Sequence, residues 1–335
     1  MLTDRREFLK STTAAFLGLT VLPLQASGEV MTVSGRIKVS KMGWSLIHEH
    51  ILVDFIGADK ISPDRWEREA VVKKVLPYLL EIRKLGCDTL VECTPAYLGR
   101  DVVLLNELAD RSGLQILTNT GYYGARDNQH LPAHAFSEVA EQLAERWIGE
   151  FENGIDGTGI RPGFMKIGVN PGPLSEMHQK LIRAAAITHK ATGLTIASHT
   201  GPGLPAFEQM NILEDMGVQL NAFIWVHAQN EKDTSRQVEA ARRGAWVSLD
   251  GISQQNMAWY LEVLNALKEA GLLDRVLLSH DAGWYRPGEE DGGDFRPYTD
   301  IFAHFLPYLK ENGYGSKEIK QLMIENPAEA FRIRK

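Results

Sequence analysis

Two histidines one residue apart, His48 and His50, end an apolar stretch that begins at Gly43. In a β-strand, residues i and i+2 point to the same face and lie about 6–7 Å apart. Two imidazoles at that separation can close on one metal ion. The intervening Glu49 points to the opposite face of such a strand, so the pattern does not favour it as a ligand.

Four more potential metal ligands lie at or near the ends of other short apolar runs: Lys166, His199, His227 and Asp281. Each of them alone has an ordinary structural interpretation, as a hydrogen-bonded histidine, a salt-bridged lysine or a helix-capping aspartate. Their joint occurrence favours one shared site. The histidines in loops or helical patterns are interpreted as structural, and these are His130, His134, His178, His189 and His304.

Eight short apolar runs alternate with segments of helical periodicity, and they are the elements that position these residues. The runs span residues 44–47, 89–92, 115–118, 163–169, 194–198, 222–226, 245–249 and 276–279. Eight strand–helix units predict a single (β/α)8 TIM barrel, whose functional residues gather at the C-terminal ends of the strands. A doubly wound open sheet is the rival fold, but no glycine-rich phosphate loop follows the first run.

Capping residues and prolines predict where several helices begin and end. The predicted helices run from Asp101 to Gly113, from Ser175 to Gly193, from about Asp233 to Gly244, and from Asn256 to Gly271. Pro77 lies inside the first helical pattern and should kink or split it. Asn326-Pro327 is expected to open the final helix.

The composition is that of a soluble globular protein, with 44% hydrophobic and 24% charged residues among 335. A net charge of −7 leaves no basic face, so nucleic acid is not an expected partner. Cys87 and Cys93 fall in one predicted strand, where about 20 Å would separate them, so they are interpreted as core residues without a disulfide.

Residues 1–26 have the features of an export signal. Arg5-Arg6 resembles a twin-arginine motif, and the apolar run from Ala14 to Leu24 is too short for a bilayer, which needs about 20 residues. No cysteine follows the run, so no membrane anchor is expected. The sequence therefore predicts a periplasmic or exported protein with a barrel over residues 27–335, and the cleavage position stays open because Leu24 is not a small residue.

From about Gly43 to Phe331 the chain resembles the phosphotriesterase family of the amidohydrolase superfamily. The motifs that carry the resemblance are His48-Glu49-His50, Thr94–Asp101, Thr120-Gly121-Tyr122-Tyr123, Phe164-Met165-Lys166-Ile167-Gly168, Ser198-His199-Thr200, Val226-His227, Ser279-His280-Asp281 and Glu325-Asn326-Pro327-Ala328. Together these motifs are specific, whereas a bare His-x-His is not.

The resemblance implies a binuclear centre of divalent metal ions. His48, His50 and Asp281 would bind the more buried ion, and His199 and His227 the more exposed one. Lys166 would bridge both ions as a carbamate formed with CO₂. Imidazole and carboxylate ligands favour zinc, with manganese, cobalt and iron as alternatives.

The implied activity is hydrolysis of a small molecule by a metal-bridging hydroxide, with Asp281 taking up the proton. Tyr123 aligns with a tyrosine of lactonases that resemble this chain, which favours a lactone or a carboxylic ester as substrate. Asn230 stands where phosphotriesterases tend to carry a proton-relay aspartate, and Gly251 stands where family members often carry a histidine or arginine as a relay or pocket wall. These departures argue against efficient organophosphate hydrolysis and against the usual lactonase pocket. Hydrolysis of N-acyl amides or phosphoesters, and ligand binding without turnover, remain alternatives.

Two further expectations concern partners and specificity. Relatives of this kind are commonly dimers, so the resemblance implies a homodimer. The loop over residues 284–297 follows the last predicted strand and carries charges of both signs. Arg286 or Arg296 could meet an anionic group of the substrate, or the loop could be a solvated lid with internal salt bridges.

Overall fold

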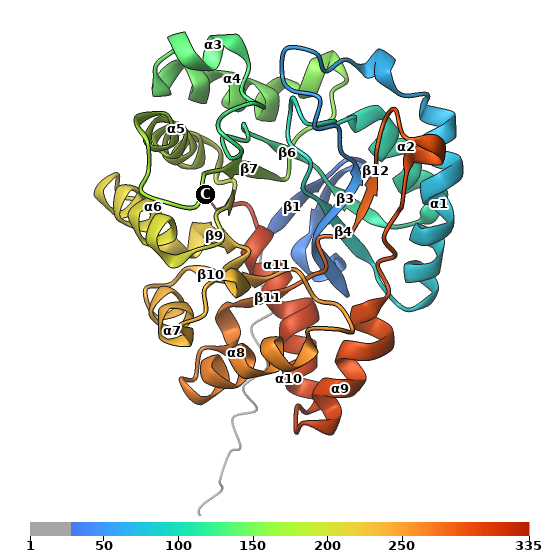
Figure 1. The fold of residues 1–335 in the computed structure, drawn as a ribbon, viewed down its shortest axis with the longest axis vertical. Helices are drawn as coiled ribbons and strands as arrows, with labels where there is room; N and C mark the ends of the chain where they lie inside the picture. Colours follow the sequence, from blue (N-terminus) through green and yellow to red (C-terminus); the bar gives the residue numbers. More distant parts are fainter. Residues whose placement is uncertain (1–27, 335) are drawn as a thin grey trace, which may run out of the picture.

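Eight parallel strand positions succeed one another in chain order around the centre of the molecule, and helices surround them (Figure 1). The computed structural model describes residues 28–334. The strands are β3 (Ser45–Leu52), β4 (Thr89–Glu92), β5 (Gln115–Leu117) with its continuation β6 (Asn119–Thr120), β7 (Phe164–Gly168), β8 (Ile196–His199), β9 (Phe223–Val226), β10 (Trp246–Leu249) and β11 (Val276–Leu278). The predicted (β/α)8 barrel is confirmed. Each strand begins within two residues of its predicted start, but β3 extends past His48 and His50 instead of ending before them.

The barrel consists of two sheets, with the orders β11-β10-β9-β8-β7-β6 and β12-β3-β4-β5. Only Thr118 separates β5 from β6. At the other junction, between β11 and β3, the His48 backbone donates to Ser279 Oγ at 2.9 Å, and the Asp281 backbone donates to His48 O at 3.0 Å. β12 (Gly283–Tyr285) pairs with the second half of β3, opposite His50 and Leu52.

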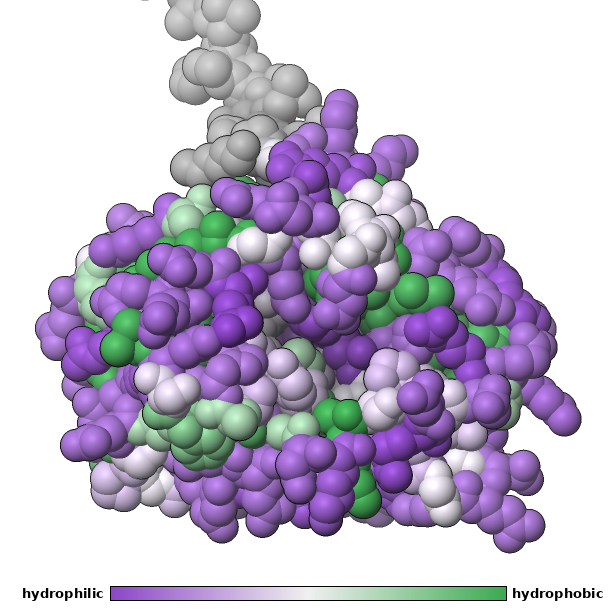
Figure 2. Space-filling model, turned by 90° about the horizontal axis from the view of Figure 1, so that it is seen from above, coloured by the Kyte–Doolittle hydropathy of each residue, from purple (hydrophilic) through white to green (hydrophobic). Residues whose placement is uncertain are grey.

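The outer layer consists of helices whose apolar faces cover the strands. They are α1 (Arg68–Lys84), α2 (Val102–Ser112), α3 (Ala133–Ser137), α4 (Ala140–Asn153), α5 (Glu176–Thr192), α6 (Gly203–Asp215), α7 (Thr234–Arg242), α8 (Met257–Glu269), α9 (Leu306–Glu311), α10 (Ser316–Lys320) and α11 (Asn326–Phe331). Buried residues of α1 recur every three or four positions, as an amphipathic helix requires, at Val71, Val72, Val75, Leu79 and Ile82. Figure 2 shows the side that α3 and α4 cover, where the surface is mostly hydrophilic.

Two of the predicted N-terminal helix caps form capping hydrogen bonds. Asp101 accepts a hydrogen bond from the Leu104 backbone at 3.1 Å, and Ser175 accepts one from the His178 backbone at 3.2 Å. α2 ends before left-handed Gly113, and α5 ends before a similar glycine. α7 and α8 end two residues before the glycines that were predicted to close them.

The helices around two prolines differ in part from the predictions. α1 continues through Pro77 without splitting. The final α-helix, α11, begins at Asn326 with Pro327 in its first turn as predicted, but it continues α10 and a π-helical segment over Gln321–Glu325 without a break. A second π-helical segment, Ile301–Phe305, precedes Pro307 in the same way. A π-helical turn shifts the hydrogen-bond ladder, so it can accommodate a proline that has no N–H to donate.

The interior of the barrel is apolar, and its N-terminal end is covered by a hairpin that the sequence did not predict. The hairpin consists of β1 (Glu29–Thr32) and β2 (Gly35–Lys38), and Val33 N donates to Ile116 O at 2.8 Å. Its buried Val30 belongs to the same cluster as Phe164 and Phe331. Cys87 and Cys93 are buried and free as predicted, although they flank β4 rather than lie within it.

No helix within residues 28–334 is both long and apolar enough to cross a membrane. The export signal predicted for residues 1–26 lies outside the described residues.

Candidate metal centre

The six candidate ligands come together in one cavity of about 50 Å³ at the C-terminal ends of the strands. His48 and His50 come from β3, Lys166 from β7 and His199 from β8. The other two candidate ligands are His227, directly after β9, and Asp281, three residues after the end of β11. Both adopt left-handed backbone conformations, with φ of +61° and +54°. These residues are separated by up to 233 positions in the sequence, and only the barrel brings them together.

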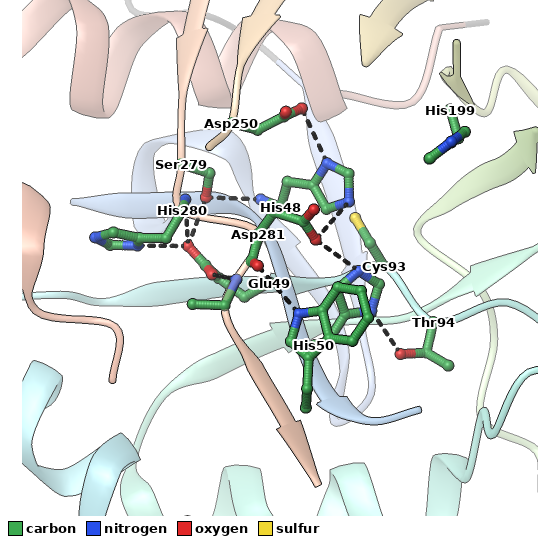
Figure 3. A network of polar contacts seen from close by, with 12 residues as sticks. His48, Glu49, His50, Cys93, Thr94, His199, Asp250, Ser279, His280 and Asp281 are labelled. Carbon is green, nitrogen blue, oxygen red and sulfur yellow. Dashed lines mark hydrogen bonds and ion pairs between the residues drawn. The ribbon is translucent and has the colours of Figure 1, made fainter. Parts of the chain in front are cut away.

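The two histidines of β3 each turn one ring nitrogen away from the cavity and the other into it (Figure 3). His48 Nδ1 lies 3.0 Å from Asp250 Oδ2, and His50 Nδ1 lies 2.8 Å from Thr94 Oγ1. His50 Nε2 therefore faces Asp281 Oδ1 at 3.1 Å. The three candidate ligand atoms of His48, His50 and Asp281 lie within 4.8 Å of one another, as ligands of one ion must.

His199 and His227 form the second histidine pair of the site. His227 Nδ1 is held at 2.6 Å by Asp250 Oδ1, so that its Nε2 faces His199 Nδ1 at 2.9 Å. His227 Nε2 also lies 4.0 Å from Asp281 Oδ2, which places Asp281 between the two pairs.

Asp250 is a functional residue that the sequence analysis missed. It is completely buried after β10, and its two oxygens contact the Nδ1 atoms of both His48 and His227. Burial alone would raise the pKa of Asp250, but the charges and hydrogen bonds of His227 and His48 outweigh burial and hold this pKa well below its usual value. The carboxylate thus fixes both imidazoles with Nε2 toward the cavity. Its place directly after a predicted strand was the signal that could have found it.

Lys166 is buried at the floor of the cavity, and within residues 28–334 no carboxylate lies within ion-pair distance of its ammonium group. Its Nζ instead lies 3.2 Å from His48 Nε2. A buried ammonium among imidazoles costs free energy unless it is paired. A carbamate on the same nitrogen would be an anionic ligand, so the residues present fit a pair of divalent cations.

The ring nitrogens of His48 and His199 are available as ligands near neutral pH, whereas the charge and hydrogen bond of Asp250 outweigh burial and raise the pKa of His227. Burial, together with the charge of Lys166, lowers the pKa of His48 to about 4. Burial and the neighbouring His227 hold the pKa of His199 well below its ordinary value. Metal ions bind the neutral imidazole, so these environments favour the ligating form.

Apolar and aromatic side chains form the remaining wall of the cavity: Val53, Phe55, Cys93, Pro95, Leu98, Tyr123 and Trp284. The Tyr123 ring lies 5.0 Å from the His199 ring, and burial raises the pKa of its hydroxyl, which therefore stays protonated. The Trp284 ring lies 5.2 Å from the His50 ring.

The charged loop after β11 does not offer its arginines to the cavity. Arg296 donates to His280 O at 2.9 Å and to Ile252 O at 2.7 Å, and Arg286 lies 3.5 Å from Glu289. Arg286 thus pairs within the loop, whereas Arg296 holds the loop to the backbone of neighbouring segments. These contacts argue against either arginine as the anion-binding residue.

Gly251 and the remaining histidines take no part in the cavity. A Cβ atom on Gly251 would lie 2.7 Å from Tyr260 Oη, so a larger side chain has no room at this position. This agrees with the absence of a relay residue there in the sequence. The non-ligand histidines of the sequence analysis lie outside the lining residues. Three of them bond elsewhere: His134 to Tyr122, His178 to Gly124 O and His189 to Leu194 O.

Fold and site together define a (β/α)8 barrel that gathers histidine, carboxylate and lysine side chains able to act as metal ligands. The chain belongs to the phosphotriesterase family, whose model matches residues 28–331. It is 27% identical to the phosphotriesterase homology protein of Escherichia coli over 87% of this chain and 98% of that protein. It is 26% identical to the aryldialkylphosphatase of Saccharolobus solfataricus, over 88% and 96% of the two chains.

Two further similarities bear on the activity. An N-acetyltaurine hydrolase of Salmo salar is 28% identical over 90% of this chain and 97% of that protein. The solved structure of an organophosphorus hydrolase from Deinococcus radiodurans superposes with a TM-score of 0.81 at 27% identity, covering 93% of this chain and 99% of that one. The family and these relatives make the protein a hydrolase.

Proposed function

We propose that this protein hydrolyses a lactone or a related carboxylic ester at a centre of two divalent metal ions, for which zinc is the best match. The observation that carries the proposal is the cavity, where six ligand side chains lie beneath an apolar wall. An uncharged acyl compound fits such a wall, since a charged substrate group there would lose its hydration without finding a partner.

His48, His50 and Asp281 would hold one ion, His199 and His227 the other, and Lys166, carboxylated by CO₂, would contact both. The bound ions would supply a hydroxide near neutral pH and polarise the scissile carbonyl. The ligand set is the histidine and carboxylate type that zinc prefers.

The side chains around the ions have separate tasks in this hydrolysis. The Asp281 side chain is 25% exposed, so it can accept the proton of the attacking water and pass it to the leaving oxygen. Tyr123 presents a protonated hydroxyl beside His199, where it can donate a hydrogen bond to the substrate and orient the acyl group. Phe55, Leu98 and Trp284 exclude water from the reacting atoms.

A second candidate is hydrolysis of an N-acyl amide that carries a distal anion. The Arg126 guanidinium lies 4.3 Å above the ring of Phe55, which lines the cavity, and among residues 28–334 no carboxylate pairs with it. N-acetyltaurine, named in the relatives of Salmo salar and Mus musculus, has an amide and a sulfonate. An exposed cation at the edge of the cavity could bind such an anion.

Steady-state assays of the zinc-loaded protein on lactones, aryl esters, N-acyl amino acids, N-acetyltaurine and paraoxon distinguish these candidates. We expect the highest kcat/KM on a lactone or an aryl ester, and little turnover of paraoxon. A preference for N-acetyltaurine that falls about tenfold in Arg126→Met, with lactone turnover unchanged, would instead favour the amidase. Tight binding of these compounds without any turnover would favour a binding protein.

We further propose that residues 1–26 direct export to the periplasm through the twin-arginine route, and that the mature protein is a homodimer without a membrane anchor. The support for export is the Arg5-Arg6 pair ahead of a short apolar run. Replacing both arginines by lysine should retain the protein in the cytoplasm. Sedimentation of the purified protein at the mass of a single chain would contradict the dimer.

A further inference from the structure

Glu49 lies between two ligands on β3, yet its carboxylate points out of the cavity and is completely buried. It accepts four hydrogen bonds from a single segment of the chain. Its Oε1 accepts from Ser279 Oγ at 2.7 Å, from His280 N at 3.0 Å and from His280 Nδ1 at 2.7 Å. Its Oε2 accepts from Ala282 N at 2.9 Å. Figure 3 shows Glu49 among these partners.

The segment that Glu49 holds is the one that carries Asp281. The backbone N–H groups on both sides of Asp281, those of His280 and Ala282, donate to the same carboxylate. Asp281 itself adopts a left-handed conformation with φ of +54°, which costs a non-glycine residue about 1 kcal/mol or more. β11 ends at Leu278, so its ladder cannot fix this conformation. The contacts to β3 fix it instead.

The hydrogen bonds of His280 indicate which of its ring nitrogens donates to Glu49. The Nε2 atom of His280 accepts a hydrogen bond from Ile301 N at 2.9 Å, so that nitrogen carries no proton. The proton is then on Nδ1, which donates to Glu49. All four groups around the carboxylate are therefore donors, and only an anionic residue with two acceptor oxygens satisfies them.

We propose that Glu49 is a positioning residue of the metal centre, whose carboxylate holds Asp281 in its ligating orientation. The His48-Glu49-His50 triplet would then supply two ligands from one face of β3 and the support of a third ligand from the other face. The inference rests on the proposed metal centre, but not on the identity of the substrate.

Glu49→Gln tests the proposal, because the glutamine amide has an NH₂ group in place of one acceptor oxygen. That NH₂ group would face a hydrogen-bond donor of the 279–282 segment. Asp101→Asn is the matched control. Asp101 is also a buried carboxylate, bonded to the Trp66 indole at 3.0 Å and to the Leu104 backbone, but it does not line the cavity. The measurements are zinc affinity in competition with a chelator, the visible spectrum of the cobalt-substituted protein, and thermal unfolding.

We expect Glu49→Gln to weaken zinc binding at one site by about 10–100-fold and to change the cobalt spectrum, since a support of a ligand is lost. Asp101→Asn should lower the unfolding temperature without changing either metal readout. If Glu49→Gln does not fold, Ser279→Ala removes one donor to Glu49 together with the acceptor of the His48 backbone N–H, and it should weaken zinc binding several-fold.

Parent-like zinc affinity and an unchanged cobalt spectrum in Glu49→Gln, or in Ser279→Ala where only that variant folds, would overturn the inference alone. A parent protein that binds no zinc would overturn the proposed function and the inference together.

Discussion

At the scale of single residues, the site depends on which nitrogen each histidine turns toward the cavity. Asp250 decides this for His48 and His227, and Thr94 contacts the outer nitrogen of His50. The convergence of the candidate ligands on one cavity could be predicted, because each lies at or near the end of a short apolar run. Asp250 could not be assigned its role in the same way, since it contacts residues 202 and 23 positions away. Such contacts become visible only in the folded chain.

Asp250→Asn should weaken metal binding while leaving the fold intact. An asparagine has one acceptor oxygen, so it can serve the Nδ1 of His48 or of His227, but not both. We expect zinc affinity to fall about 10–100-fold and the free energy of unfolding of the metal-free protein to fall by about 1–3 kcal/mol. Chelator competition and chemical denaturation measure the two effects. Ser248→Ala, which removes only a donor to Asp250 Oδ2, is the control with a smaller effect on affinity.

His130 should make the metal-free protein less stable in acid. It is fully buried, lies between the rings of Phe55 and Tyr123, and has no hydrogen-bond partner among the described residues on either nitrogen. Burial and the charge of Arg126 lower its pKa from 6.5 to about 4. Between pH 6.5 and pH 4, His130 is protonated in the unfolded chain but not in the folded protein. Its contribution to the free energy of unfolding is therefore complete above pH 6.5 and is lost as the pH falls toward 4.

The variant His130→Phe keeps the aromatic contacts and removes this titration. Denaturation curves at pH 7 and pH 5 should show a smaller loss of stability in the variant than in the parent, by up to about 1.4 kcal/mol per pH unit. Equal losses in the two proteins would show that His130 titrates normally.

At the scale of secondary structure elements, features that depend on residues close in sequence could be predicted. Features that depend on packing against distant elements could not. The caps Asp101 and Ser175 depend on a side chain and a backbone N–H three residues away, which the sequence displays. The π-helical segment before Pro327 and the pairing of β12 with β3 depend on packing against the rest of the barrel. The continuation of β3 through His50 belongs with them, since β12 is its partner there.

Gly283→Ala should disturb the metal centre through β12. Gly283 has φ of +97°, and a Cβ atom there would overlap His50 O and Tyr298 Oη. The ligand strand would have to move, so we expect a loss of about 2–4 kcal/mol in unfolding free energy together with weaker zinc binding. Gly271→Ala, at a φ of +72° with nothing within 4 Å, should cost only about 1 kcal/mol and leave zinc binding intact. Similar effects of the two variants would contradict the steric argument.

At the scale of the whole molecule, the six candidate ligands come from β3, β7 and β8 and from the segments after β9 and β11. Two bound ions would therefore connect distant parts of the barrel. Removing them should lower the unfolding temperature, and zinc added above its dissociation constant should raise it again. Each bound ion adds RT ln(1 + [Zn²⁺]/Kd) to the free energy of unfolding, about 2.7 kcal/mol at a hundredfold excess. Differential scanning calorimetry at several zinc concentrations measures this. An unfolding temperature independent of zinc would indicate that no ion joins these strands.

The most direct test of the central claim is anomalous diffraction at the zinc edge from crystals of the active protein. The account predicts two peaks in one cavity, one among His48, His50 and Asp281 and the other beside His199 and His227, with a carboxylated Lys166 between them. Active protein with no metal in this cavity, or with zinc bound only elsewhere, would contradict it.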